Sequence, residues 1–491
     1  MLRQLAAAAV FGTLVSVGGA AQDASGVVAS ASKAMGVTDL RSITYSGSAA
    51  NGNFGQSKSI AGPLATTTIT NYTRAIDLGQ PASRATGTTQ PPTIPGAPPP
   101  PPGTLNQNIT PANAAWAQQL EIWITPWGFL KGAAANQATV RSQRVGGKTY
   151  NVASWSPAQK SPGGKPYTLT GYINDQNLVE RVETWVEHPV MGDLHVDTSY
   201  DNYQDFSGVK VPGKITQKRA GLVTFEATIT AASPNPANIA ELLTPPAGQG
   251  RGGAPGAGAP AAAAPAPPAP PTVEAQKLAE GVYRITGGYV ALAVEFKDHV
   301  VVLEGGQSEA RGLAVIAETR KAIPNKPIRY VVNTHAHFDH ASGLAPFAAE
   351  GITIITHENN KSFLERALNG PRTLVGDALA KSSRKAKVDS VGDKRVLKDD
   401  THTLELHYIR TLEHSDGMLV GYLPKERLLF TGDFNIPAQG QPVSPAIATL
   451  VQNVDRLKLD FDGHVLVHAP NPDRPMTKAD LLGLLKGTKA P

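Results

Sequence analysis

Three imidazoles and a carboxylate close the stretch Val331-Val332-Asn333-Thr334-His335-Ala336-His337-Phe338-Asp339-His340. The stretch begins within the β-branched run that starts at Ile328, and such a run is typical of a buried strand. His335 and His337 are two positions apart, so on an extended backbone their side chains project to the same side. Asp339 and His340 follow and can face a second point. We therefore expect a loop at a strand end with room for two metal ions.

The composition narrows the choice of metal. Neutral imidazole together with carboxylate suits zinc best, while iron or manganese would also accept these ligands. The chain contains no cysteine, so thiolate ligation is excluded. All but two of its twelve histidines, His188 and His195, lie beyond residue 290, which places the metal chemistry in the C-terminal half.

The pattern His335-x-His337-x-Asp339-His340 resembles the signature of the metallo-β-lactamase-fold hydrolases, and the resemblance extends from about Val273 to the end of the chain. It implies a four-layer αββα fold and a binuclear zinc site. By resemblance, His414 completes the first metal site with His335 and His337. Asp433 matches the aspartate that bridges the metals, and His468 joins Asp339 and His340 in the second site.

The sequence around these further ligands fits the implied positions. Asp433 and His468 each follow a short apolar run, and Gly417 permits a tight turn after His414. His464 is the alternative to His468, because relatives usually have glycine on both sides of this histidine and Val467 and Ala469 stand here. Asp416 and Thr334 are candidate outer partners of the ligands, and Glu304 occupies a position where relatives more often have aspartate.

The remaining regions suggest three further segments. Residues 1–21 combine Arg3, an apolar run from Leu5 to Val17 and small residues, which predicts a signal peptide and a periplasmic or secreted protein without a transmembrane segment. Residues 22–231 contain short β-type runs separated by turns, Glu121–Thr125 among them, and predict a β-rich domain that resembles the half-barrel of periplasmic lipoprotein carriers. Residues 232–272 are rich in Pro, Ala and Gly and predict a linker.

Residues 273–491 alternate strands and helices, which predicts an α/β domain whose ligand loops leave the carboxyl ends of strands. Ser308–Ala322 is expected to be a helix. The segment from Asn359 to Asp389, with a basic end, is the expected cover of the site.

The predicted function is that of an exported zinc-dependent hydrolase acting on an ester, lactone, thioester, amide or phosphodiester. Asp339 would orient the attacking water or take its proton. The alternatives are an oxidoreductase with one iron, similar to persulfide dioxygenases, and a carrier whose β-rich domain binds an apolar ligand. The expected partner is a small-molecule substrate. The net charge of +5 comes with only 17% charged residues and no basic run, so nucleic acid is not expected.

Overall fold

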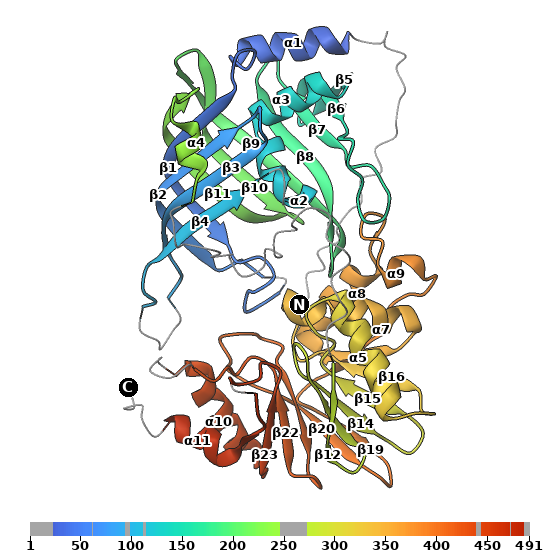
Figure 1. Cartoon of the computed structure of the whole chain (residues 1–491). Coiled ribbons are helices and arrows are strands. Elements are labelled where there is room, and N and C mark those ends of the chain that lie inside the picture. The colour runs from blue at the N-terminus through green and yellow to red at the C-terminus, as the bar shows by residue number, and fades with distance from the viewer. Residues whose placement is uncertain are drawn as a thin grey trace, which may run out of the picture.

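The computed structural model describes residues 23–60, 62–93, 99–110, 114–245, 273–437, 443–471 and 473–485. The predicted signal peptide and most of the predicted linker lie outside these ranges. Two bodies are stacked along the long axis of the molecule, a large curved sheet above and a layered α/β domain below (Figure 1). No helix in the described ranges has the length and apolarity needed to cross a bilayer.

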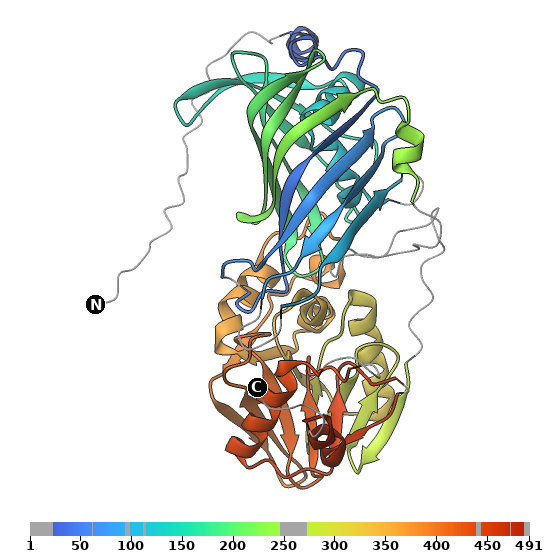
Figure 2. The same cartoon turned by 90° about the vertical axis from the view of Figure 1, so that its left-hand side faces the viewer.

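The first domain is one antiparallel sheet of eleven strands in the order β4-β3-β2-β1-β11-β10-β9-β8-β7-β6-β5. The sheet curves around helices α2 and α3, and α1 closes one end (Figures 1 and 2). The strands are β1 Ser42–Gly52, β2 Thr66–Asp77, β3 Ala82–Gln90, β4 Gly103–Ile109, β5 Thr139–Val145, β6 Lys148–Trp155, β7 Leu169–Ile173, β8 Val179–His188, β9 Gly192–Phe206, β10 Val209–Arg219 and β11 Leu222–Pro234. The helices are α1 Ala24–Ala34, α2 Trp116–Trp123, α3 Pro126–Ala135 and α4 Ile239–Leu243.

Two expectations for this domain were wrong. Glu121–Thr125 is not a strand, because α2 runs through Trp123 and buries Trp116, Leu120 and Ile122 against the inside of the sheet. Tertiary packing has overridden the β propensity of this run. The expected boundary at residue 231 falls inside β11, whose end pairs with β1, and α4 follows it.

The interior of the curved sheet is filled by side chains. Trp127 and Phe129 on α3 are buried in one cluster with Tyr45, Tyr200 and other strand residues. The Tyr45 and Trp127 ring centroids are 5.8 Å apart. Trp127 and Phe129 are therefore core residues.

The second domain has four layers. A seven-stranded sheet, β12-β13-β14-β15-β16-β17-β18, faces a six-stranded sheet, β19-β20-β21-β22-β23-β24, and helices cover the outer faces. The first sheet comprises β12 Ala275–Ala279, β13 Val282–Ile285, β14 Ala291–Glu295, β15 Val300–Leu303, β16 Ile328–Val332, β17 Thr353–His357 and β18 Val388–Val391. The second comprises β19 Lys394–Lys398, β20 Thr403–Tyr408, β21 Leu419–Leu423, β22 Leu428–Thr431, β23 Gly463–Leu466 and β24 Met476–Thr477. The helices are α5 Glu309–Ala322, α6 Phe338–Ala341, α7 Leu344–Glu350, α8 Glu358–Asn369, α9 Ala378–Lys381, α10 Pro445–Leu457 and α11 Lys478–Leu485.

Strand periodicity explains the layers. In β15, Val300 and Val302 pack toward the outer helices, whereas Val301 and Leu303 pack between the two sheets. In the second sheet, Val420 packs toward α10, and its neighbour Leu419 packs inward. Apolar residues at every position of such strands are buried on both faces, which is why the runs do not alternate with polar residues.

Helix α5 begins close to the predicted residue, because the Ser308 hydroxyl accepts a hydrogen bond from the Arg311 amide and caps the helix. The segment expected to cover the site forms α8 and α9, which pack on the outer side of the first sheet (Figure 1), and Asn359 and Asn360 at the start of α8 bond carbonyls of the loop that follows His414. Its basic residue Arg384 lies against Gly351 at the end of α7, and Lys385 bonds the Asn369 carbonyl.

Candidate metal centre

The ligand candidates leave neighbouring strand ends on one edge of the two facing sheets. β15, β16 and β17 are parallel, and the loop that carries His335, His337, Asp339 and His340 follows β16. β22 and β23 are also parallel, with Thr431 opposite Leu466, so Asp433 and His468 emerge side by side. Chain segments far apart in sequence thus meet where parallel sheets usually keep their chemistry.

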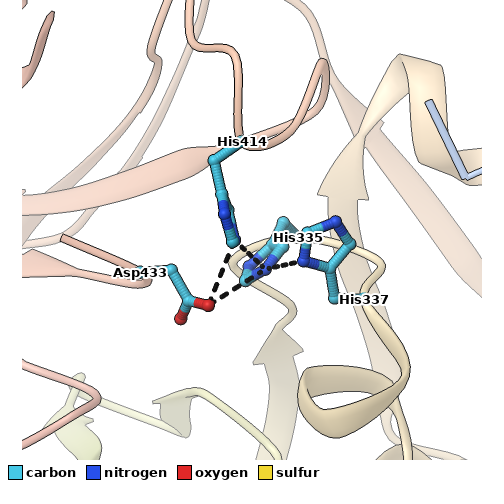
Figure 3. A group of neighbouring side chains, drawn as sticks. All are labelled: His335, His337, His414 and Asp433. Atoms are coloured by element: carbon cyan, nitrogen blue, oxygen red, sulfur yellow. Dashed lines mark hydrogen bonds and ion pairs between the residues drawn. The ribbon is translucent and has the colours of Figure 1, made fainter. Parts of the chain in front are cut away.

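One group consists of His335, His337, His414 and Asp433 (Figure 3). His335 Nε2 is 3.0 Å from His337 Nδ1 and 3.4 Å from His414 Nε2. Asp433 Oδ2 lies 3.1 Å from His414 Nε2 and 3.9 Å from His335 Nε2. Three nitrogens and one oxygen therefore converge on a common point.

A second group consists of Asp339, His340, Asp433 and His468. Asp433 Oδ1 lies 2.8 Å from His340 Nε2 and 2.9 Å from His468 Nε2, and Asp339 Oδ2 lies 3.6 Å from His340 Nε2. Within each group the ligand atoms all lie within 4.8 Å of one another. Asp433 belongs to both groups and turns one oxygen toward each, which is the geometry of a bridging carboxylate.

The hydrogen bonds around these residues indicate that a cation fits. Thr334 Oγ1 donates its one proton to Glu304, 2.9 Å away, so it can only accept from the Nδ1–H of His335, at 3.2 Å. His337 Nε2 faces the Ser57 carbonyl at 3.1 Å and must donate to it. The neutral rings then turn two lone pairs toward each other at 3.0 Å, a contact that is repulsive unless a cation lies between them.

The second group gives an independent indication. His340 Nε2, His468 Nε2 and Asp433 Oδ1 are buried, and no hydrogen bond of acceptable geometry satisfies any of them. Buried polar atoms are normally paired, so three such atoms around one point fit a metal site. The donor set of imidazole and carboxylate suits zinc.

Glu304 is the main partner behind the ligands. It is fully buried, and its Oε2 lies 3.1 Å from His340 Nδ1 in addition to its bond with Thr334. A carboxylate can only accept, so Glu304 fixes Nδ1 of His340 as the donor and turns Nε2 toward Asp433. Its backbone has a φ of 76°, and its Oε1 accepts from the Gly306 amide. The glutamate thus makes the outer contact despite its longer side chain.

The electrostatics of the site follow from burial and close charges. Burial together with the neighbouring imidazoles holds the pKa of His335 well below its ordinary value, and burial lowers the pKa of His337 to about 4. Burial alone would raise the pKa of Asp433, but the surrounding histidines hold it far below its usual range. These residues therefore have the protonation states that ligands need.

The pKa of His340 is shifted in the opposite direction. Burial disfavours its charged form, but Glu304 and Asp433 on either side outweigh burial and hold the pKa of His340 well above its ordinary value. A proton on His340 balances two carboxylates, and a bound cation would take over that role.

The structure shows which of the two alternatives, His468 or His464, joins the second group, and it is His468. His464 is fully buried on β23, bonds Thr431 Oγ1 at 2.9 Å and belongs to neither group. His357 caps α8 by accepting from the Asn359 amide, and His299, His402 and His407 make contacts with neighbouring residues away from the ligand groups. Asp416 makes an ion pair with Lys58 at 3.9 Å rather than a contact with a ligand.

Three partners of the ligands were not found from the sequence. The Tyr289 hydroxyl donates to Asp339 Oδ2 at 2.7 Å, and its ring centroid lies 4.3 Å from that of His468. Gln56 and Ser57 belong to the first domain, and they contact Asp339 and His337. The only sequence signal was the position of Tyr289 beside a glycine turn between two strands, and Gln56 and Ser57 gave none.

A cavity of about 390 Å³ opens beside the ligands. Its wall includes His414, Asp433 and Glu413, and the other described wall residues are small, polar or apolar: Thr411, Asn435, Ser444, Pro445, Ala446 and Thr449. The size is that of a small-molecule site. Among the described wall residues, Glu413 is the one charged side chain other than the ligand candidates.

A family model described as the metallo-beta-lactamase superfamily matches residues 286–469. The 2,4-dinitroanisole O-demethylase subunit alpha of Nocardioides sp. (strain JS1661) is 24% identical over 206 residues, which are 40% of this chain and 58% of that relative. This chain thus matches little more than half of the relative's length.

Solved structures match a similar share of the chain. A metallo-beta-lactamase from Pontibacter korlensis is 18% identical, with a TM-score of 0.34, and the match covers 44% of this chain and 100% of that one. FIM-1 from Pseudomonas aeruginosa, in its mono-zinc form, is 18% identical, with a TM-score of 0.32, over 43% of this chain and 92% of that one.

Proposed function

We propose that the chain is a hydrolase with a binuclear zinc centre, because residues 286–469 match the model of the metallo-beta-lactamase superfamily. The observation that carries the proposal is the pair of four-residue groups that share Asp433. His335, His337 and His414 would hold one ion, Asp339, His340 and His468 the other, and Asp433 would bridge them. Two divalent cations held there would supply Lewis acidity, which makes water nucleophilic at neutral pH and polarises the bond to be cleaved.

Asp339 is the proposed catalytic residue among the ligands. Burial would raise its pKa, but His340 and the hydrogen bonds from Tyr289 and Gln56 lower it, so the carboxylate is ionised at neutral pH. The two donors occupy Oδ2 at 2.7 Å and Oδ1 at 2.5 Å, and they fix the plane of the carboxylate. An ionised, oriented carboxylate can align a water molecule or accept its proton.

The cavity supports an uncharged substrate. Its described wall contains neither lysine nor arginine, and its one carboxylate outside the ligand groups, Glu413, pairs with Lys58 at 2.8 Å, so this wall offers no free cationic side chain to bind a phosphate. We therefore place esters, lactones, thioesters and amides ahead of phosphodiesters. The screen should include 2,4-dinitroanisole, because the name of the relative in Nocardioides states that it O-demethylates this compound.

The test has two parts. Elemental analysis of the purified protein should give two zinc ions per chain, and hydrolysis of at least one uncharged substrate should be lost in His335→Ala while far-UV circular dichroism stays unchanged. His299→Ala is the matched control, since His299 lies away from both groups. One iron per chain would move the proposal to oxidative chemistry, and undiminished turnover in His335→Ala would refute it.

The carrier alternative receives no support from the first domain, because the interior of its sheet is filled with buried side chains. Export stays a proposal that rests on the apolar segment from Leu5 to Val17. Expression in a Gram-negative host, followed by N-terminal sequencing of the periplasmic fraction, should give a mature protein that begins at Gln22. Retention of Met1 in the cytoplasm would contradict it.

A further inference from the structure

The connection between β1 and β2 reaches from the first domain to the ligand loops of the second (Figures 1 and 2). It makes one backbone hydrogen bond to each of two ligand loops. The Phe338 amide donates to the Gly55 carbonyl at 3.0 Å, and the Asp416 amide donates to the Lys58 carbonyl at 2.8 Å. Residues 54–58, which we name the inter-domain loop, therefore touch the loop of His337 and Asp339 as well as the loop of His414.

The inter-domain loop determines which nitrogen of His337 faces the metal centre. A carbonyl oxygen only accepts, so the Ser57 carbonyl holds the proton of His337 on Nε2, 3.1 Å away. Nδ1 is left with its lone pair directed toward His335 Nε2. Ligating histidines are commonly oriented by a partner on the other ring nitrogen, and here the first domain supplies that partner.

The same loop holds the Asp339 carboxylate. Gln56 Nε2 donates to Oδ1 at 2.5 Å, while Tyr289 of the second domain donates to Oδ2. The Asp339 side chain is one-third exposed, so fewer neighbours restrain it than restrain the fully buried His340. Loss of the Gln56 bond would leave one donor to orient this carboxylate.

Apolar packing keeps the loop in place. The Phe54 ring meets the Phe338 ring edge-on at a centroid distance of 5.1 Å, and His188 packs against both rings. Gly55 has a φ of 84°, and a Cβ there would lie 2.0 Å from the Phe338 ring. Only glycine permits this approach, so a methyl group at residue 55 would push the loop away from the ligands.

A second contact fixes the two domains relative to each other. Arg372, buried beside Asp377, donates to the carbonyls of Pro189 at 2.6 Å and Val190 at 3.0 Å in the first domain. Asp193 accepts from the Leu374 amide at 2.8 Å. These charge-assisted bonds, away from the metal centre, hold the inter-domain loop in one position, as a preorganised site requires.

We propose that the inter-domain loop is a positioning element of the metal centre, which orients His337 through the Ser57 carbonyl and Asp339 through the Gln56 amide. The second domain by itself is then an incomplete site. This inference rests on the proposed binuclear centre. The cavity wall contains His414 and Asp433, whereas the loop contacts His337 and Asp339, so the loop acts on the metal geometry without lining the cavity.

The test measures metal binding and uses Co²⁺ alone as the probe. In the full-length protein, Gln56→Met removes the donor and keeps a side chain of similar size. We expect about tenfold weaker Co²⁺ affinity at one of two sites in a chelator competition, together with a changed ligand-field absorption spectrum. A merely structural role of Gln56 would lower the melting temperature and leave that spectrum unchanged.

Gly55→Ala tests the approach of the loop independently. It should weaken Co²⁺ binding by at least as much as Gln56→Met and should also change the spectrum. Gly221→Ala is the matched control, because Gly221 has a φ of 82° and open space around its Cβ position, so it carries the same backbone strain without the contact. Gln176→Ala, in an exposed turn of the first domain, is the control for Gln56.

The outcomes separate the two proposals. Two tightly bound ions in the wild type, with the same affinities and spectrum in Gln56→Met and Gly55→Ala, would overturn the positioning role and leave the hydrolase proposal standing. A wild type that binds no Co²⁺ would overturn both. Altered spectra in both variants, but in neither control, would establish the positioning role.

Discussion

The two halves of the metal centre are held in different ways. His335 and His340 are oriented from inside their own domain, by Glu304 directly or through Thr334. His337 and Asp339 depend on Ser57 and Gln56, which lie 280 and 283 positions away in the first domain. One half of the site, His335 and His340, is therefore oriented within the second domain, and we call it the fold-determined half. The other half, His337 and Asp339, depends on how the two domains dock.

Burial follows this division only in part, since His337 is buried like His335 and His340, but Asp339 is not. Glu304 and His340 have fully buried side chains, whereas Asp339 is one-third exposed and Lys58, at the end of the inter-domain loop, is 43% exposed. Polar contacts in a dry interior cost more to break than contacts that water can replace. Substitutions on the two sides should therefore differ in magnitude, and this can be measured.

The largest effect is expected where the two halves meet. Asp433→Asn removes one anionic oxygen from the residue shared by both groups, so binding of both ions should weaken and turnover should fall about a thousandfold, or about 4 kcal/mol. Metal analysis and turnover on the substrate found in the screen would check this. Asp462→Asn, an exposed carboxylate paired with Arg427, is the control. A fall below tenfold would refute the bridge.

The next effect concerns how the stability of the second domain depends on pH through the buried His464. Burial lowers the pKa of His464 from 6.5 to about 4, a shift that corresponds to about 3 kcal/mol. Because the folded pKa is the lower one, this stability is fully present above pH 6.5 and is lost as the pH falls toward 4. Urea unfolding of the chelator-treated protein between pH 8 and 4 should show a shallower decline in His464→Gln than in the wild type. Parallel declines would contradict a buried neutral His464.

Glu304→Gln probes the fold-determined half directly. Oε2 of Glu304 accepts from both His340 Nδ1–H and the Thr334 hydroxyl, and Oε1 accepts from the Gly306 amide, so the NH₂ group of glutamine would face a donor in either orientation and a contact must be lost. We expect about 10-fold to 100-fold weaker metal affinity, measured by chelator competition, and a larger effect than that of Gln56→Met. Glu318→Gln on α5, another glutamate with a mostly buried side chain but no ligand contact, should bind metal as the wild type does. If Gln56→Met exceeded Glu304→Gln, the ranking of the two halves would be reversed.

The smallest effect is expected at the exposed ion pair between Lys58 and Glu413. Lys58 pairs with Glu413 at 2.8 Å, but both side chains are more than 40% exposed. Such pairs contribute about 0–1 kcal/mol and weaken with salt. Lys58→Ala should change metal affinity less than about fivefold. High salt should likewise change the metal affinity of the wild type less than about fivefold. A tenfold loss would mean that the ion pair, rather than the hydrogen bonds of Gln56 and Ser57, holds the loop.

Much of the second domain could be predicted because its signals are local. The run from Ile328 to Val332 forms β16 and carries the histidine loop at its carboxyl end, and the capping residue Ser308 begins α5. All seven ligand candidates lie together in the structure, since each follows a strand or precedes a glycine turn that the sequence marks. The four-layer fold predicted from the resemblance is confirmed.

The first domain was less predictable. Glu121 to Thr125 has strand propensity but ends α2 and begins the turn after it, because the curved sheet needs apolar helices to fill its concave face. The last strand continues past residue 231, since its end pairs with β1 and not with a neighbour in sequence. Propensity describes a residue alone, whereas these outcomes depend on partners far along the chain.

The sequence by itself therefore determined the layered domain, its ligand types and the strand ends that present them, because strand periodicity and ligand chemistry are properties of short segments. Only the tertiary structure decided that Glu304 reaches His340, that His468 rather than His464 faces Asp433, and that Gln56 and Ser57 of another domain support the site. Such contacts depend on the docking of surfaces hundreds of residues apart, and no local pattern encodes that docking.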